Sequence, residues 1–315
     1  MAESSMFRSA TVPTLFCINQ RYAKHAGVCI VSLLENNSWA FFDIVVVSTG
    51  DLGGEAAKLR RTLAAYPNCA LKTVRFNPRA DIRLPVRAHY SIDNYTRLWM
   101  AEFFPASVSK VLYLDSDMVV TGDISGMWNA PLGDAVIGAV TIPGSTRCSA
   151  FAIPEPYGYF NSGVLIVDLA RWRREDIFTR LIDYLVANHE KIVDADQDVL
   201  NACLYDRRLA LPYIYNAISP FFFEYHPLGI DADELAAVRD NARIVHFNGA
   251  SKPWSYLCRH PRRADYWRYL AGTEWRDDEP EDRNFANWTK KTFGPLVPEA
   301  LRNYVRARVS AAAAE

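Results

Sequence analysis

The chain has 315 residues, of which 50% are hydrophobic and 23% charged, and its formal net charge is -1. This length and balance are typical of a globular protein with a sizeable core, arranged as one large domain or two small ones. The near-zero charge excludes proteins that bind nucleic acid through an overall basic character, so we expect no nucleic-acid partner.

Strand-like and helical patterns alternate along the first third of the chain. Short apolar or alternating runs predict strands at residues 14–18, 42–49 and 71–76 and again from residue 110. Segments with helical spacing, each closed by Asn or Pro, predict helices at residues 25–37, 55–66 and 94–104. This alternation predicts an α/β fold whose sheet is mainly parallel.

The remaining chain continues this alternation with longer irregular stretches. Strands are predicted at residues 135–141 and 242–249, and residues 159–173 predict a strand that leads into a helix. Helices are predicted at residues 178–189 and 197–205. Residues 141–158 show no period and contain Gly and Pro, which predicts a long surface loop that frames a substrate.

The stretch KVLYLDSDMVV (residues 110–120) places two aspartates inside an apolar run. Asp115 and Asp117, two residues apart, face the same way in extended chain, at the end of a strand where α/β sheets bind ligands. A D-x-D alone also arises by chance or caps a turn, but apolar residues flank this pair on both sides. Its hard carboxylate oxygens suit Mn²⁺ or Mg²⁺, which would offset their repulsion and hold a diphosphate.

His246 ends another predicted strand, and the stretch HFNGASKPW (residues 246–254) adds Gly249 and Lys252. Glycine permits close approach of the backbone, and lysine provides positive charge for phosphate. A lone histidine is more often a structural group than a ligand. Together with the two aspartates, however, His246 would make a three-ligand site that leaves positions open for phosphate oxygens.

Six stretches in fixed order, between residues 14 and 258, resemble family 8 of the glycosyltransferases. They are NQRYAKHAGVCIVSLLENN, YTRLWMAEFFP, KVLYLDSDMVVTGDISGMWN, YFNSGVLIVDLARWRREDIF, DADQDVLNACL and HFNGASKPW. This family contains retaining, metal-dependent enzymes that use UDP-sugars, among them bacterial lipopolysaccharide α-galactosyltransferases and glycogenin. The resemblance implies a GT-A fold, a single Rossmann-like domain with a mixed, mainly parallel sheet, which we place at residues 1–275. The change in composition after residue 276 predicts a C-terminal helical tail at residues 276–315.

The resemblance also implies roles for individual residues. It assigns the metal to Asp115, Asp117 and His246, with Asp115 also at the donor sugar. It implies that Tyr22 and Asn19 contact the uracil and that Gly249 and Lys252 hold the diphosphate. The catalytic residues that it implies are Asn161, Asp196 and Gln197, which surround the transferred sugar, and Arg97, which approaches the donor near the aspartates. The family usually has an acidic residue where this chain has Asn19, so the base specificity is an open point.

Several of these residues also have a structural interpretation. Tyr22 is compatible with a cap at a strand–helix junction, and Arg97 with an ion pair to Asp117 or Asp198. Asp168 and Asp198 are expected to be structural, the first as a helix N-cap and the second near a helix start. For the reaction we favour attack of the acceptor from the side of the leaving group, because the amide of Gln197 is a poor nucleophile.

The C-terminal segment at residues 284–315 is basic, aromatic and amphipathic. From Pro298 onward, four apolar residues share one helical face: Leu301, Tyr304, Val305 and Val309. Such a segment suits an anionic membrane surface and a lipid-linked acceptor, although a packed helix or a frayed tail is equally compatible.

Other features indicate the compartment. The six cysteines form no CxxC pair, and no apolar run resembles a signal peptide or a membrane span. We therefore expect a cytoplasmic protein with reduced cysteines, either free or peripheral on the cytoplasmic face of the membrane. As substrates we expect a UDP-hexose, galactose or glucose, and a glycan or glycolipid acceptor such as lipopolysaccharide.

Three other functional classes remain as alternatives. A sugar nucleotidyltransferase needs a glycine-rich loop after the first strand, where this chain has FCINQRYAK. A dinucleotide-dependent oxidoreductase needs a G-x-G-x-x-G fingerprint, and TGDLGGE has the wrong spacing. A non-catalytic glycan-binding module would need neither both aspartates nor Lys252.

Overall fold

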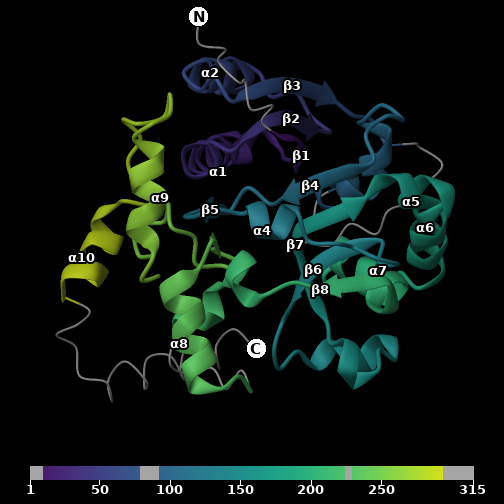
Figure 1. Cartoon of the computed structure of the whole chain (residues 1–315). Helices are drawn as coiled ribbons and strands as arrows, with labels where there is room; N and C mark the ends of the chain where they lie inside the picture. The colour runs from purple at the N-terminus through teal and green to yellow at the C-terminus, as the bar shows by residue number, and fades with distance from the viewer. Residues whose placement is uncertain (1–9, 79–91, 224–228, 294–315) are drawn as a thin grey trace, which may run out of the picture.

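The computed structural model, shown in Figure 1, describes residues 10–78, 92–223 and 229–293 of the chain. Seven strands form the main sheet in the spatial order β3-β2-β1-β4-β7-β6-β8. They are β1 (Ala10–Cys17), β2 (Ala40–Ser48), β3 (Cys69–Arg75), β4 (Lys110–Leu114), β6 (Ile137–Thr141), β7 (Phe160–Asp168) and β8 (Arg208–Ala210). Strand β7 runs antiparallel to both of its neighbours and the other pairs are parallel, which confirms the predicted mixed, mainly parallel sheet.

A second, small sheet in the order β5-β10-β9 lies beside the first. Its strands are β5 (Met118–Val120), β9 (Ala217–Ile218) and β10 (Ile244–His246). The described helices are α1 (Ala23–Asn36), α2 (Gly54–Leu63), α3 (Ile92–Tyr95), α4 (Ser125–Trp128), α5 (Leu169–Arg174), α6 (Ile177–Ala187), α7 (Ala195–Leu204), α8 (Ala232–Asn241), α9 (Arg263–Leu270) and α10 (Phe285–Phe293).

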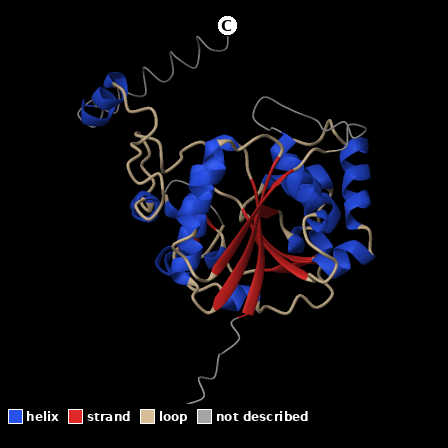
Figure 2. Cartoon of the chain, turned by 90° about the horizontal axis from the view of Figure 1, so that it is seen from above, coloured by secondary structure: helices blue, strands red, loops and turns tan. Residues whose placement is uncertain are grey.

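Helices cover both faces of the main sheet, as the view in Figure 2 shows. Alternate residues of β2 serve the two faces, because successive side chains of a strand point in opposite directions. Ile44 and Val46 belong to the hydrophobic core shared with α1, α2 and α9. Val45 and Val47 belong to the core shared with α6 and α7. A strand buried on both faces needs a continuous apolar run, which explains the sequence of β2.

The stretch at residues 110–120, predicted as one strand, forms two strands in different sheets. Strand β4 ends at Leu114, and β5 begins at Met118 in the small sheet. The backbone between them is held on both sides, since Asp115 N donates to Gly163 O at 2.8 Å and Phe247 N donates to Asp117 O at 2.9 Å. The two aspartates therefore lie at the junction of the two sheets.

Two other segments differ from the predictions. Residues 94–104 were expected to form one α-helix, but after α3 the segment Thr96–Glu102 is a 3₁₀-helix. Its residues from Thr96 to Met100 are all buried, so the segment has no amphipathic period. Packing on every side determines its geometry. The predicted loop at residues 141–158 contains two short 3₁₀ turns, Thr146–Phe151 and Glu155–Tyr157.

Candidate active site

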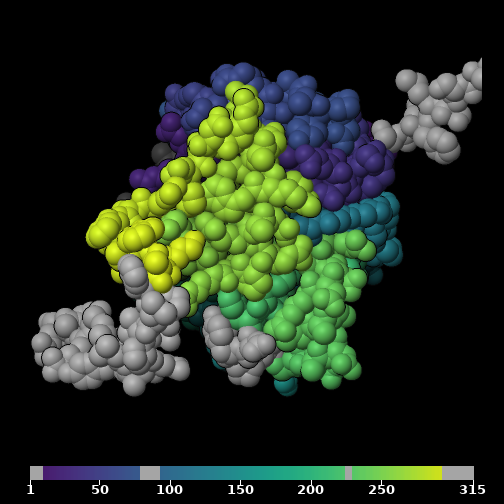
Figure 3. Space-filling model, turned by 90° about the vertical axis from the view of Figure 1, so that its left-hand side faces the viewer, coloured from purple at the N-terminus to yellow at the C-terminus, as the bar shows by residue number. Residues whose placement is uncertain are grey.

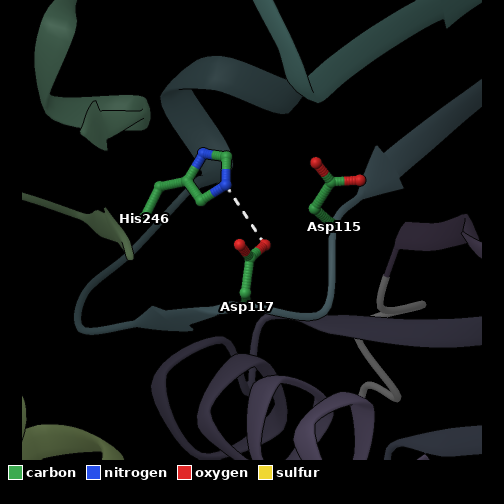
Figure 4. Close-up of side chains that lie close together, drawn as sticks. All are labelled: Asp115, Asp117 and His246. Carbon is green, nitrogen blue, oxygen red and sulfur yellow. Dashed lines mark hydrogen bonds and ion pairs between the residues drawn. The ribbon is translucent and has the colours of Figure 1, made fainter. Parts of the chain in front are cut away.

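Three potential metal ligands meet where the two sheets join, as Figure 4 shows. Each of Asp115, Asp117 and His246 offers one ligand atom, and these atoms all lie within 4.8 Å of one another. The two aspartates come from the β4–β5 connection and the histidine from the end of β10. His246 Nε2 lies 3.2 Å from Asp117 Oδ1. Two carboxylates and an imidazole form a donor set suited to Mn²⁺ or Mg²⁺.

The ring of His246 is oriented by a chain of hydrogen bonds that starts at a backbone amide. Gly163 N donates to Asn161 Oδ1 at 3.0 Å, so this oxygen is an acceptor. The same oxygen accepts from Asn216 Nδ2 at 2.8 Å. Asn216 Oδ1 is therefore left to accept from His246 Nδ1 at 2.9 Å. In the neutral imidazole this leaves the lone pair on Nε2, on the side of Asp117, where a metal would bind.

Gly163 keeps this site compact. A Cβ atom at this position would lie 2.5 Å from His246 Cε1 and 2.8 Å from Asp115 Oδ2. Both distances are far below van der Waals contact, so a larger residue would push the ligands apart. A glycine inside a strand often marks such a close approach, and Gly163 lies in the middle of β7.

Lys252 lies against the same aspartate. Its Nζ atom is 2.5 Å from Asp117 Oδ2 and also donates to Phe247 O at 2.9 Å. Burial alone would raise the pKa of Asp117, but the positive charge of Lys252 and contact with His246 hold the pKa of that carboxyl well below its usual range. Burial lowers the pKa of Lys252, and Asp117 more than reverses this, so the ammonium stays charged. Gly249, in the same loop, has a φ of 86°, a backbone conformation that favours glycine.

Arg97 joins the aspartate pair to helix α7. Its guanidinium lies 2.9 Å from Asp115 Oδ1 and 3.1 Å from Asp196 Oδ2. The alternative of an ion pair to Asp117 or Asp198 is therefore wrong, because the buried 3₁₀ segment directs Arg97 towards Asp115 and Asp196. Burial raises the pKa of Asp196 to about 7, an effect that Arg97 opposes.

The residues expected around a transferred sugar also come together. Gln197 Oε1 accepts from Asn161 Nδ2 at 3.0 Å and from Ser162 N at 3.1 Å. Asp196 Oδ2 accepts from Ser162 Oγ at 3.1 Å. Strand β7 and the first turn of α7 thus bring Asn161, Asp196 and Gln197 into one cluster beside Arg97.

Tyr22 and Asn19 lie at the start of α1, after β1. The Tyr22 ring packs edge-on against His25 and Trp254, at centroid distances of 5.5 and 6.1 Å. Burial raises the pKa of Tyr22, Lys252 opposes this effect, and Asp117 adds to it. Asn19 caps the turn that follows it, since its Oδ1 accepts from Arg21 N at 3.1 Å.

Comparison with protein families decides the class of this protein. The sequence model of glycosyl transferase family 8 matches residues 13–258 of the chain. The chain belongs to this family. The protein is a glycosyltransferase, and this removes the nucleotidyltransferase, oxidoreductase and non-catalytic alternatives.

Relatives from two bacteria align with most of this family 8 protein. It is 29% identical over 301 residues to lipopolysaccharide 1,2-glucosyltransferase of Escherichia coli strain K12, covering 92% of this chain and 88% of that protein. It is 27% identical over 266 residues to general stress protein A of Bacillus subtilis strain 168, covering 82% and 93%. Its fold resembles galactosyltransferase LgtC in complex with donor and acceptor sugar analogs, with a TM-score of 0.71 at 23% identity, covering 86% and 98%. This likeness confirms the GT-A fold.

Several residues that build the site of this family 8 protein were given no site role from the sequence. Asn216 orients His246, Ser162 contacts Asp196 and Gln197, and Tyr113 donates to Asp115 Oδ1 at 2.6 Å. Arg147, from the loop at residues 141–158, contacts the buried Asp198. The expectation for Asp168 is confirmed, because its Oδ1 accepts from Arg171 N at 2.7 Å as the N-cap of α5.

Proposed function

We propose that this glycosyltransferase transfers a hexose, glucose or galactose, from a UDP-sugar to a glycan acceptor with retention of configuration. The observation that carries the proposal is the cluster of Asp115, Asp117 and His246 beside Lys252. Two carboxylates and an imidazole would hold Mn²⁺ or Mg²⁺, and the adjacent ammonium suits a diphosphate. Because relatives include lipopolysaccharide 1,2-glucosyltransferase, we propose lipopolysaccharide or another cell-surface glycan as acceptor.

The remaining residues have roles that follow from their positions. A divalent cation would supply Lewis-acid stabilisation of the leaving diphosphate. Lys252 would add a positive charge to the same oxygens, and Gly249 would let the backbone approach them. Tyr22 would stack on the uracil and Asn19 would contact its edge. Asp115, Arg97, Asn161, Asp196 and Gln197 would hold the hydroxyls of the transferred sugar.

The surroundings of Gln197 support attack from the side of the leaving group. Its carbonyl oxygen already accepts two hydrogen bonds, from Asn161 and Ser162, so neither lone pair is free to attack carbon. In the proposed step the bond between the anomeric carbon and the phosphate oxygen breaks. The acceptor hydroxyl bonds to the same face of that carbon, and its proton passes to the leaving phosphate. A trapped glycosyl–enzyme adduct would contradict this step.

The test is turnover of UDP-glucose and UDP-galactose in Mn²⁺ and in EDTA, with release of UDP as the readout. We expect turnover in Mn²⁺, none in EDTA, and none in Asp117→Ala. Asp134→Ala is the matched control because Asp134 is a fully exposed aspartate on the surface. Metal-independent turnover would contradict the assigned ligands, and absence of turnover with either sugar would contradict the proposed donors.

We also propose that the C-terminal segment contacts an anionic membrane surface. Among the described residues, no helix combines the length and apolarity needed to span a membrane. On α10, shown in yellow in Figure 3, the side chains of Phe285 and Trp288 are 78% and 43% exposed. Their rings stack 5.8 Å apart, and Lys290 and Lys291 occupy the last turn of the helix. The predicted apolar face from Leu301 to Val309 lies outside the described residues.

A further inference from the structure

A series of side-chain contacts connects Arg147, a residue with no role assigned from the sequence, to Gln197. Arg147, in the loop at residues 141–158, forms an ion pair of 2.5 Å with Asp198 Oδ2. Tyr159 OH lies 2.6 Å from Asp198 Oδ1. Gln197 Nε2 lies 3.4 Å from the same hydroxyl. These contacts therefore connect a surface loop to the side-chain amide of Gln197, which we place beside the transferred sugar.

Every acceptor position of Asp198 is occupied by a donor. Its side chain is fully buried, and Arg147 contacts both of its oxygens, at 3.2 and 2.5 Å. The amides of Val193 and Asp194 donate to Oδ2 at 2.6 and 2.8 Å. A buried carboxylate needs such compensation to remain charged. The guanidinium of Arg147 thus keeps Asp198 as an acceptor.

The direction of each hydrogen bond follows from the groups at the two ends of this series of contacts, the Asp198 carboxylate and the Ser162 backbone amide. Because the Asp198 carboxylate accepts, Tyr159 must donate its proton to Asp198. Burial raises the pKa of Tyr159 far above its usual value, and Asp198 adds to this effect, so the hydroxyl keeps its proton. The hydroxyl oxygen is then left to accept from Gln197 Nε2. At the far end, the backbone amide of Ser162 can only donate, and it faces Gln197 Oε1 at 3.1 Å. Both ends therefore require the same orientation of the amide.

We infer that Tyr159, Asp198 and Arg147 form a positioning relay that fixes the side-chain amide of Gln197, with its oxygen on Ser162 and its nitrogen on Tyr159. The inference rests on the proposed function, in which Gln197 lies at the transferred sugar. If the amide were turned, its NH₂ group would face the N–H group of Ser162, and two donors would meet. In the fixed orientation the second N–H of Gln197 is available as a hydrogen-bond donor to the sugar, and its oxygen does not act as a nucleophile. The loop that carries Arg147 would thereby set the geometry of the donor-sugar subsite.

The sequence permits a direct test, because Gln20 and Gln197 are its two glutamines. In protein labelled with ¹⁵N at the glutamine side chains, NMR should show two amide pairs, and Gln197→Met identifies the one that belongs to Gln197. Tyr159→Phe, which removes only the hydroxyl, should shift the Gln197 pair and leave the Gln20 pair in place. The matched control is Tyr157→Phe, two residues away and 41% exposed, which should shift neither.

Kinetics provide the second readout. With the donor that the wild type turns over, Tyr159→Phe should lower kcat on the order of 10- to 100-fold. The KM for the UDP-sugar should stay within about twofold, because the diphosphate and metal contacts are untouched. Arg147→Met should act in the same direction, and Arg147→Lys should restore part of the rate. A general structural defect would lower the melting temperature, but it would not lower kcat while leaving KM nearly unchanged.

The possible outcomes separate the relay from the proposed function. A Gln197 resonance that does not move in Tyr159→Phe would overturn the relay, whatever the activity. A shifted resonance in a protein that turns over neither UDP-glucose nor UDP-galactose would support the relay and contradict the proposed donors. A shifted resonance with unchanged kcat would overturn the claim that the orientation of Gln197 matters for transfer.

Discussion

The Nζ atom of Lys252 lies 2.5 Å from Oδ2 of Asp117, which is also one of the three proposed metal ligands. An ammonium in this position partly neutralises the aspartate, as a divalent cation would. When a cation binds Asp117, the ammonium becomes available to the diphosphate beside it. We therefore expect Lys252 to oppose the binding of the metal alone and to favour the binding of the metal with UDP.

This relationship predicts opposite effects of Lys252→Met on two binding constants. The affinity for Mn²⁺ alone should be unchanged or higher, because a competing positive charge is removed. The affinity for UDP in saturating Mn²⁺ should fall by about tenfold or more, because one charged contact to phosphate is lost. Calorimetric titrations with Mn²⁺ and then with UDP measure both. Lys58→Met, at a more exposed lysine on α2, is the control, and a loss of Mn²⁺ affinity in Lys252→Met would contradict the idea.

Gly163→Ala tests whether the ligand cluster is as compact as the structure indicates. The added methyl would lie 2.5 Å from His246 Cε1, so the imidazole or Asp115 must shift. Affinity for Mn²⁺ should fall by more than about tenfold, since metal sites tolerate only small displacements of their ligands. Gly50→Ala is the matched control, because a Cβ atom at Gly50 meets nothing within 4 Å. Equal Mn²⁺ affinities in the two variants would show that His246 or Asp115 is not a ligand.

Arg97 should be important for stability as well as for the site. Arg97→Met leaves Asp115 and the buried Asp196 without their shared guanidinium, which should lower the free energy of unfolding by about 3 kcal/mol. Asp196→Asn in the same background should recover part of this loss. Urea unfolding of the single and double variants, in EDTA, measures the coupling. Arg61→Met, which breaks an exposed ion pair, should leave the stability nearly unchanged. If the effects of Arg97→Met and Asp196→Asn on the free energy of unfolding simply added, a direct interaction between Arg97 and Asp196 would be contradicted.

The sequence predicts the parts of this protein that depend on local pattern. Helix α1 ends at Asn36, strand β2 is a β-branched apolar run, and the apolar run around Asp115 and Asp117 marks the proposed ligands. Strands β8 and β9 were not predicted, because they have three and two residues and form by pairing with distant strands. The separation of β4 from β5 was not predicted for the same reason, because β5 is short and pairs with the distant strand β10.

The partners of the site residues were harder to predict than the residues themselves. Asn216 is a single polar residue in YIYNAIS, and it becomes informative only when the fold brings it to His246. Arg97 was predicted at the site, but the aspartates predicted to pair with it were wrong. The sequence does not show which aspartate of DSD (residues 115–117) and of DQD (residues 196–198) faces the guanidinium. Gly163 was the detectable case, since a glycine inside a buried strand indicates a close approach of other groups.

Stability should fall as the pH is lowered from about 6.5 to 4. Burial lowers the pKa of His25 to about 3, and burial lowers that of His260 to about 4. In this range the unfolded chain protonates both histidines and the native protein neither, so each makes unfolding easier by about 1.4 kcal/mol per pH unit. Asp196 acts in the opposite sense, because burial raises its pKa to about 7 and the native state takes up its proton first. Two histidines act against one aspartate, so the net effect should be a loss of stability as the pH falls.

Two variants separate these contributions. His25→Phe should flatten the slope, because the remaining histidine and Asp196 then cancel. Asp196→Asn should make the slope steeper, since both histidines then act unopposed. Urea unfolding at pH 6.5, 5.5 and 4.5 in EDTA gives the slopes. The same slope in wild type and His25→Phe would show that His25 is accessible to protons in the native protein.

The stacked pair of Phe285 and Trp288 should decide whether the protein binds membranes. Both rings are exposed on α10, so inserting them into a bilayer interface would remove apolar surface from water. Replacing both with Ser in the full chain should weaken binding to vesicles containing phosphatidylglycerol by at least about tenfold. Binding of UDP should be unchanged, because neither Phe285 nor Trp288 belongs to the proposed UDP site.

Vesicle flotation in low and high salt measures this effect. Removal of residues 284–315 should release the protein from vesicles while turnover of the UDP-sugar continues. Tyr157→Ser, at an exposed aromatic residue on a different loop, should leave vesicle binding unaltered. Full binding by the Phe285→Ser, Trp288→Ser protein would rule out α10 as the contact. Binding that is equally strong to neutral phosphatidylcholine vesicles would contradict a role for Lys290 and Lys291, because their charges act on anionic lipid.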